Sequence, residues 1–141
     1  MARLTILVDV NVFLDIFTRR QPFYTASAGV WAAVENDFVD GLIAAHRVTT
    51  LFYLVERYTN HQQAVLAISD LLRVFRVAPV NQNVLMQAMA LNWRDFEDAV
   101  QVCAAIEAGG RYIISRDATG FAGQGLPVLS PTDMLQLLNA S

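Results

Sequence analysis

The sequence predicts an α/β protein with a mostly parallel central sheet covered by helices on both sides. Its 141 residues suit one domain, which we expect to span residues 1–141. Short apolar runs without alternation, such as Leu4–Val8, are typical of strands buried on both faces. These runs alternate with longer segments whose apolar residues recur every three or four positions. That alternation predicts strand–helix–strand units and hence a parallel sheet.

The first half of the chain begins with the strand Leu4–Val8, which ends in Asp9. Asn11 can cap a helix that begins at Val12, because its side-chain oxygen can accept a backbone N–H of the first turn. The segment Arg19–Pro22 then breaks this helix. Further helices are predicted over 24–36, over 62–72, and from Thr49 or Thr50 to residue 58, with strands over 39–45 and 74–77. Gly41 is expected to weaken the strand over 39–45.

The second half contains the most regular helical pattern, over residues 95–108. Acidic residues in its first turn suit the positive end of the helix dipole, and Gly109-Gly110 ends the helix. Pro131 opens a last helix because proline is tolerated at the first helical position. The remaining predicted elements are a helix over 81–91, strands over 111–115 and 127–129, and a loop over 117–125.

Composition limits the class of protein. Hydrophobic residues make up 55% of the chain, enough for a substantial core, yet no apolar run reaches the roughly 18–20 residues that span a bilayer. The first residues do not resemble a secretory leader, so we expect a cytoplasmic protein. The single cysteine, Cys103, excludes an intrachain disulfide and lies among small apolar residues, which predicts burial.

All ten basic residues are arginine, and the net charge is −3. The absence of lysine argues against P-loop enzymes and against phosphoryl-transfer sites that depend on a lysine. The acidic balance argues against broad coating of nucleic acid, so a nucleic-acid enzyme of this composition needs a local arginine patch or a metal ion. The candidate arginines are Arg19, Arg20, Arg57, Arg111 and Arg116.

Four acidic residues are candidates for one site. Asp9 and Asp117 follow predicted strands, whereas Glu56 and Asp98 lie in predicted helices. Carboxylates at the carboxyl ends of parallel strands converge on one crevice, where a divalent cation offsets their repulsion. Oxygen ligands without clustered His or Cys favour Mg²⁺ or Mn²⁺ over zinc. The pattern therefore indicates metal-assisted hydrolysis of phosphodiester bonds.

Each acid also has a purely structural interpretation. Asp9 and Asp117 can serve as turn residues, and Asp98 as a first-turn charge of its helix. Asp95 is more simply explained as the N-cap of the helix over 95–108 than as a metal ligand. Asp15 is also expected to have a structural role. The two histidines, His46 and His61, do not have the spacing of metal ligands.

Three segments in series resemble the PIN-domain ribonucleases. They are the opening run over 7–15, the run over 94–101 followed by Ala104-Ala105, and the run over 113–117 with Phe121 just after. Their order and spacing match that family over nearly the full chain. Within the family, the segment Asp95-Phe96-Glu97-Asp98 is most similar to a VapC-like branch of toxins from bacterial toxin–antitoxin pairs.

The resemblance implies a three-layer α/β/α sandwich of PIN type and an endoribonuclease that uses Mg²⁺ or Mn²⁺. It assigns metal binding to Asp9, Asp98 and Asp117, with Asn11 and Ser115 supporting those acids.

Further roles are expected beside those of the resemblance. Asp95 is expected to be an accessory acid, and Arg116 to neutralise a backbone phosphate. The expected partners are an RNA substrate and a cognate antitoxin that lays an arginine-bearing segment across the crevice. Apolar faces on the second to fourth helices also predict a homodimer. No membrane partner is expected.

The sequence departs from the family at one position. The family places a glutamate about three residues after a threonine like Thr49, and here Phe52 stands there. Glu56 follows one turn later on the same helix face and is the predicted fourth catalytic acid. Two alternatives remain open: a catalytically weakened PIN-fold module that binds RNA or protein, and a structure-specific DNA nuclease.

Overall fold

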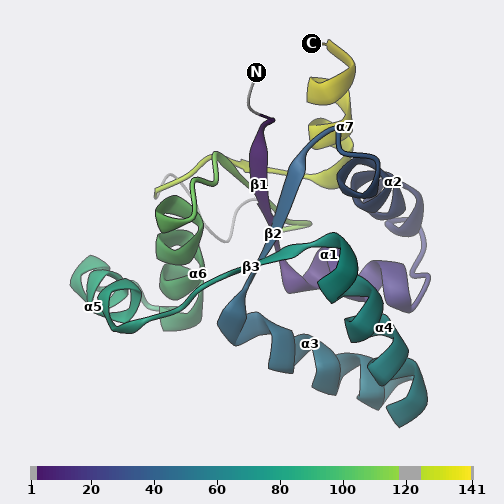
Figure 1. Cartoon of the computed structure of the whole chain (residues 1–141), viewed down its shortest axis with the longest axis horizontal. Helices are drawn as coiled ribbons and strands as arrows, with labels where there is room; N and C mark the ends of the chain where they lie inside the picture. The colour runs from purple at the N-terminus through teal and green to yellow at the C-terminus, as the bar shows by residue number, and fades with distance from the viewer. Residues whose placement is uncertain (1–2, 118–124, 141) are drawn as a thin grey trace.

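The computed structural model describes residues 3–117 and 125–140 and contains a five-stranded sheet (Figure 1). The strand order is β3-β2-β1-β4-β5, and all four pairings are parallel. β1 therefore occupies the centre of the sheet, as expected for its apolar sequence. The strands are β1 Thr5–Val8, β2 Asp40–Ala44, β3 Arg76–Ala78, β4 Tyr112–Ile114 and β5 Val128–Leu129.

Helices cover both faces of the sheet. α5 and α6 lie on one side, and α1, α2, α3, α4 and α7 lie on the other (Figure 1). The structure is a three-layer α/β/α sandwich, which confirms the predicted fold class. The helices are α1 Val10–Phe17, α2 Tyr24–Glu35, α3 Ala45–Tyr58, α4 His61–Val74, α5 Gln82–Leu91, α6 Phe96–Glu107 and α7 Pro131–Ala140.

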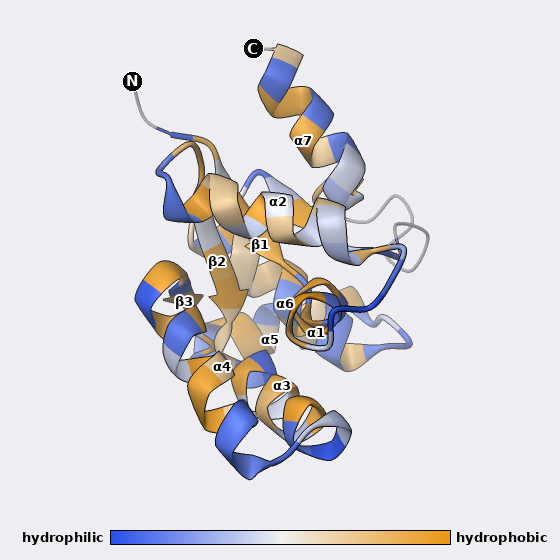
Figure 2. Cartoon of the chain, turned by 90° about the vertical axis from the view of Figure 1, so that its right-hand side faces the viewer, coloured by the Kyte–Doolittle hydropathy of each residue, from blue (hydrophilic) through white to orange (hydrophobic). Residues whose placement is uncertain are grey.

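The central strands separate two hydrophobic cores because successive side chains of a strand point to opposite faces. Ile6 and Val8 of β1 belong to the core beneath α1–α4 and α7, whereas Leu7 belongs to the core beneath α5 and α6. Cys103 is buried in this second core, as predicted. Figure 2 shows that β1 and β2 are mostly hydrophobic. A strand buried on both faces explains the unbroken apolar run in the sequence.

Two helices begin earlier than predicted. α1 begins at Val10 rather than Val12, because Asp9 is its N-cap and accepts the Val10 N–H at 2.8 Å. α3 begins at Ala45, immediately after β2, and has no side-chain cap, so the threonine pair that suggested a later start lies inside the helix. Because both helices start directly after a strand, their first turns lie at the edge of the sheet where the strands end.

Gly41 has a packing role in β2. A Cβ atom at this position would lie 2.6 Å from the Phe75 ring and 2.8 Å from Val34 Cγ1. Sequence reasoning expected Gly41 to weaken the strand. The structure shows instead that the absence of a side chain here leaves room for Phe75 and Val34 to pack against the strand. Among the described residues, none of the helices is both long and apolar enough to cross a membrane.

Candidate active site

The carboxyl ends of β1 and β4 bring Asp9 and Ser115 together. Val8 pairs with Ile114, so the residue that follows each strand lies at the same edge of the sheet. The Asp9 N–H extends this pairing by donating to the Ile114 carbonyl at 2.9 Å. Residues 106 positions apart in sequence therefore become neighbours through the strand register.

The Ser115 hydroxyl joins this edge into one network. It donates to Asp9 Oδ2 at 2.9 Å, and it accepts from Asn11 Nδ2 and from the Asp117 N–H, each at 3.2 Å. A hydroxyl has one donor and two acceptor sites, so its hydrogen-bonding capacity is filled. Ser115 is fully buried. We call Asp9, Asn11, Ser115 and Asp117 the Ser115 network, and it fixes the orientation of the Asp9 carboxylate.

The first turn of α6 brings a second carboxylate to the same place. Asp95 is the N-cap of α6 and accepts the Asp98 N–H at 3.1 Å. Burial, then the negative charge of Asp95, raise the pKa of Asp98 to about 6, while Arg47 lowers it and Asp9 adds to the rise. The influence of Asp9 shows that the two carboxylates share one electrostatic environment.

Arg47 lies within this acidic cluster. It comes from the first turn of α3 and donates to Glu97 Oε2 and to Asp98 Oδ1, each at 2.9 Å. Its side chain is only 12% exposed. Beside it, His46 Nε2 lies 3.1 Å from the Glu97 carbonyl, and burial lowers the pKa of His46. The start of α3 is thus tied to the start of α6, and a guanidinium balances part of the negative charge.

Glu56 has a different partner. Glu56 lies near the carboxyl end of α3, and its Oε2 lies 2.7 Å from Nδ1 of His61 on α4. Glu56 follows Arg47 by nine residues, which is about 13 Å along a helix axis. Phe52 also packs against His61, with ring centroids 5.7 Å apart. This geometry gives no support to Glu56 as a fourth acid of the crevice.

The chain just after β4 carries two further predicted site residues. Asp117 is exposed, and its N–H bonds to Ser115. Arg116 pairs instead with the fully buried Asp15, with Nε and Oδ2 3.0 Å apart. Burial raises the pKa of Asp15, and Arg116 lowers it. This burial and ion pair agree with the structural role that the sequence suggested for Asp15, which stays a prediction. Phe121, the other residue quoted for this segment, lies outside the described residues.

Sequence reasoning missed two residues of this region, Arg47 and Gln101. Gln101 is fully buried, and its Nε2 lies 3.5 Å from Asp9 Oδ1. A signal for it existed, because Gln101 is polar within the otherwise apolar run from Ala99 to Ala105. Arg47 had no comparable signal, since its ion pairs join helices about fifty residues apart.

The donors fit a hard divalent cation in chemical type. Asp9 and Asp98 offer carboxylate oxygens. The pKa of Asp98 is raised mainly by burial and then by the charges of Asp95 and Asp9, and a cation would relieve that repulsion. The arrangement is less complete: within residues 3–117 and 125–140, no three His, Cys, Asp or Glu side chains form a group that could hold a metal ion. In the described structure, the Arg47 guanidinium pairs with Asp98, so it takes the position that a cation would otherwise fill.

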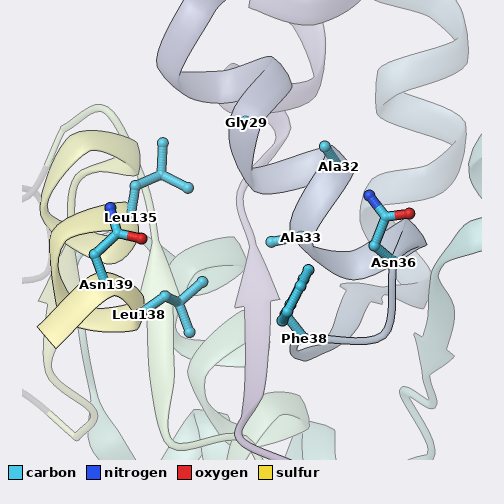
Figure 3. A pocket seen from close by; sticks show the side chains of 8 residues that line it. All are labelled: Gly29, Ala32, Ala33, Asn36, Phe38, Leu135, Leu138 and Asn139. Atoms are coloured by element: carbon cyan, nitrogen blue, oxygen red, sulfur yellow. The ribbon is translucent and has the colours of Figure 1, made fainter. Parts of the chain in front are cut away.

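A separate hollow lies between α2 and α7 (Figure 3). Phe38, whose side chain is 70% exposed, closes one side of it. All of its lining residues are uncharged, so it lacks the groups that hydrolytic chemistry needs, and the cluster at the sheet edge is the better candidate site. The lining residues are Gly29, Ala32, Ala33, Asn36, Phe38, Leu135, Leu138 and Asn139.

A parallel α/β/α sandwich with neighbouring aspartates at the carboxyl edge of its sheet defines a class of α/β proteins with an acidic site where such folds bind ligands. The chain matches the family model described as PIN domain over residues 5–119, which is most of its length. It therefore belongs to the PIN domain family, which confirms the resemblance drawn from the three sequence segments.

Relatives of the chain are found at modest identity. It is 24% identical to "Ribonuclease VapC1" of Aquifex aeolicus strain VF5 over 139 residues, or 95% of each protein. It is similar in fold to VapC20 of Mycobacterium tuberculosis, described as a sarcin-ricin loop cleaving toxin (TM-score 0.69, 20% identity, 84% of this chain and 95% of that one). It is also similar to a chain of a toxin-antitoxin complex from Klebsiella pneumoniae (TM-score 0.67, 20% identity, 89% and 97%).

Proposed function

We propose that this protein is a divalent-metal-dependent endoribonuclease that acts in the cytoplasm as the toxin of a toxin–antitoxin pair. The observation that carries the proposal is the proximity of Asp9 and Asp98 at the carboxyl edge of the sheet: Gln101, three residues after Asp98 on α6, contacts Asp9, and the charge of Asp9 contributes to the raised pKa of Asp98. Membership of the PIN domain family and similarity to a protein named as a ribonuclease support the same activity.

Most of the proposed roles follow from contacts. Asp9 and Asp98 hold Mg²⁺ or Mn²⁺. Asp117, whose N–H bonds to the Ser115 hydroxyl, is assigned as the third acid from the family resemblance. When bound, such an ion supplies a nucleophilic water at neutral pH and stabilises negative charge on the phosphate. Ser115 and Asn11 hold the Asp9 carboxylate in one orientation through the Ser115 network. Gln101 contacts the other oxygen of Asp9 from the buried face of α6.

Asp9→Asn tests the proposal. Asparagine is also a good N-cap, so α1 and the fold are expected to persist. The change removes the negative charge that binds the cation, and metal-dependent RNA cleavage is expected to fall at least about a hundredfold. Cleavage of a labelled RNA with Mg²⁺ or Mn²⁺ measures the effect, and thermal unfolding checks the fold.

Asp70→Asn is the matched control. It removes the same charge from α4, where Asp70 pairs with Arg73 on the surface. This control is expected to cleave RNA like the unmodified protein. Undiminished cleavage by Asp9→Asn would remove the proposed function.

The alternative function is a PIN-fold module that binds RNA or protein without cleaving it. One observation favours it: Arg47 already neutralises Asp98 in the described structure. Calorimetry with Mn²⁺ separates the two functions. Uptake of Mn²⁺ that Asp9→Asn abolishes supports the nuclease, whereas RNA binding without any metal uptake supports the module.

We also propose two protein partners. A cognate antitoxin would place a cationic segment across the carboxyl edge of the sheet, where Asp9 and Asp98 lie. A second copy of the chain would cover exposed apolar side chains on α4, where Val65, Leu66 and Leu72 are each more than 40% exposed. Sedimentation of the purified protein and of a Leu66→Glu variant tests the homodimer, which this variant is expected to dissociate.

A further inference from the structure

A hollow of about 310 Å³ lies between the first turns of α2 and α7, beside Arg116. It is distinct from the uncharged hollow of Figure 3, which lies further along the same two helices. Its volume falls at the lower end of the range for small-molecule sites. It combines apolar walls with a few polar groups, and the residues that matter below are Phe23, Ser27, Arg116 and Pro131.

Arg116 is held in place by an ion pair and by an aromatic ring. Its Nε lies 3.0 Å from Asp15 Oδ2, and its guanidinium carbon lies 4.3 Å from the centre of the Phe23 ring. Among the described residues, no hydrogen bond or ion pair engages its two terminal amino groups. The side chain is 30% exposed. A fixed guanidinium with free Nη groups is a suitable donor to a phosphate oxygen.

Ser27 supplies a second, independent observation. It lines the same hollow and is 1% exposed, yet its hydroxyl has no hydrogen-bond partner within the described part of the chain. A buried hydroxyl without a partner costs free energy, so such groups are uncommon unless something else completes them. A ligand with a hydrogen-bonding edge, seated in the hollow, would complete this one.

The amino end of α2 adds positive potential, because this helix begins at Tyr24 without a side-chain cap and its first turn borders the hollow. The first turn of α7 also borders the hollow, but Ser130 caps it by accepting the Asp133 N–H, and Asp133 adds a negative charge there. The amino end of a helix carries a partial positive charge and favours an anion. Together with Arg116, this favours a ligand that contains a phosphate.

The hollow adjoins the Ser115 network directly. Arg116 follows Ser115 in sequence, and the Arg116 N–H donates to Asn11 Oδ1 at 3.2 Å. Asn11 in turn bonds to the Ser115 hydroxyl that holds Asp9. A phosphate bound to Arg116 would therefore be a near neighbour of a phosphate positioned at Asp9.

We propose that this hollow receives one nucleotide of the RNA substrate, next to the phosphodiester that is cleaved. Arg116 binds its phosphate, and its base or sugar lies against Phe23 and Pro131, as bases commonly do on aromatic and apolar surfaces. The Ser27 hydroxyl hydrogen-bonds to the inserted group and contributes to the choice of nucleotide. This inference rests on the proposed function in taking RNA as the substrate.

Binding of the four ribonucleoside 5′-monophosphates tests the pocket without any cleavage. The nucleotides are titrated against the full chain, and binding is followed by ligand NMR or by calorimetry. EDTA is present so that no metal ion takes part. At least one nucleotide is expected to bind, and Ser27→Ala is expected to weaken it about threefold to tenfold by removing one hydrogen bond. Ser69→Ala, on the exposed face of α4, is the matched control and is expected to change nothing.

Arg116 needs a double variant, because Arg116→Gln alone leaves the buried Asp15 without its ion-pair partner and with only the more distant charge of Arg20 to offset its own. Asp15→Asn with Arg116→Gln removes both charges, and nucleotide binding is expected to fall at least about tenfold. Arg111→Gln is the control: Arg111 lies at the opposite end of β4, where its N–H bonds to Thr5. This variant is expected to bind nucleotides normally.

The outcomes separate this pocket from the nuclease activity. Absence of nucleotide binding, or binding that neither Ser27→Ala nor the double variant weakens, overturns the pocket even where the protein cleaves RNA. Nucleotide binding that both variants weaken supports the pocket. If the unmodified chain binds nucleotides in this way but shows no metal-dependent cleavage, the pocket stands and the proposed nuclease function is wrong.

Discussion

Asp98 is the residue through which pH acts on the candidate site. Its pKa of about 6 means that the carboxyl is neutral in mildly acidic solution and charged above neutrality. A protonated carboxyl does not bind a hard cation, since the proton and the metal compete for the same oxygens. Metal affinity is therefore expected to rise as the pH increases through about 6.

Asp95→Asn tests this dependence. The negative charge of Asp95 contributes to the raised pKa of Asp98, so its removal lowers that pKa. Asparagine still caps α6. The pH at which Mn²⁺ binding reaches half its maximum is expected to move to a lower value, measured by calorimetry between about pH 5 and about pH 8. An unchanged or higher midpoint would contradict the assignment of Asp98 as a ligand.

Arg47 gives a second prediction for a single residue. Its guanidinium holds Asp98 Oδ1, the atom that a cation would need. At about pH 8, where Asp98 is ionised with or without its neighbour, Arg47→Gln is expected to tighten Mn²⁺ binding severalfold. Arg57→Gln, at the exposed end of the same helix, controls for net charge. Weaker Mn²⁺ binding in Arg47→Gln would instead show that the arginine positions Asp98 for the metal.

At the scale of elements, α3 explains the position of Glu56. The helix begins at the sheet edge and carries Glu56 away from it, toward His61 on α4. Glu56→Gln is expected to leave RNA cleavage within about twofold of normal, and an exposed pair of this kind contributes about 0–1 kcal/mol to stability. A loss as large as that of Asp9→Asn would show that Glu56 reaches the site during the reaction.

The elements also show what the sequence could predict. Local signals such as the apolar run before Asp9, Pro131 at the start of the last helix and the paired glycines after α6 located most strands and helices. The start of α3 was missed because it has no side-chain cap to mark it. Asp9 was predictable because strand ends converge, and Asp98 because its helix segment resembles the PIN family. The Arg47 and His61 pairings depend on how helices pack and leave no trace in local spacing.

At the scale of the whole molecule, the core beneath α2 and α4 depends on the absence of a side chain at Gly41. Gly41→Ala would force Phe75 and Val34 apart, and overpacking of this kind costs about 1–3 kcal/mol. Urea unfolding measures the loss. Gly29→Ala is the control, because its added methyl would meet only the flexible end of Leu135 and alanine favours the helix. Equal stability of the two variants would contradict this view of the core.

The central position of β1 has a consequence for how the protein is made. β1 is synthesised first, but its partner β4 follows more than a hundred residues later. At typical rates of translation, this interval lasts about 5–20 seconds. During that time Asp9 has no Ser115 beside it, so a ribosome-bound or truncated chain lacks an assembled site. Any activity that needs Asp9 and Ser115 side by side can therefore begin only after β4 has been made and paired with β1.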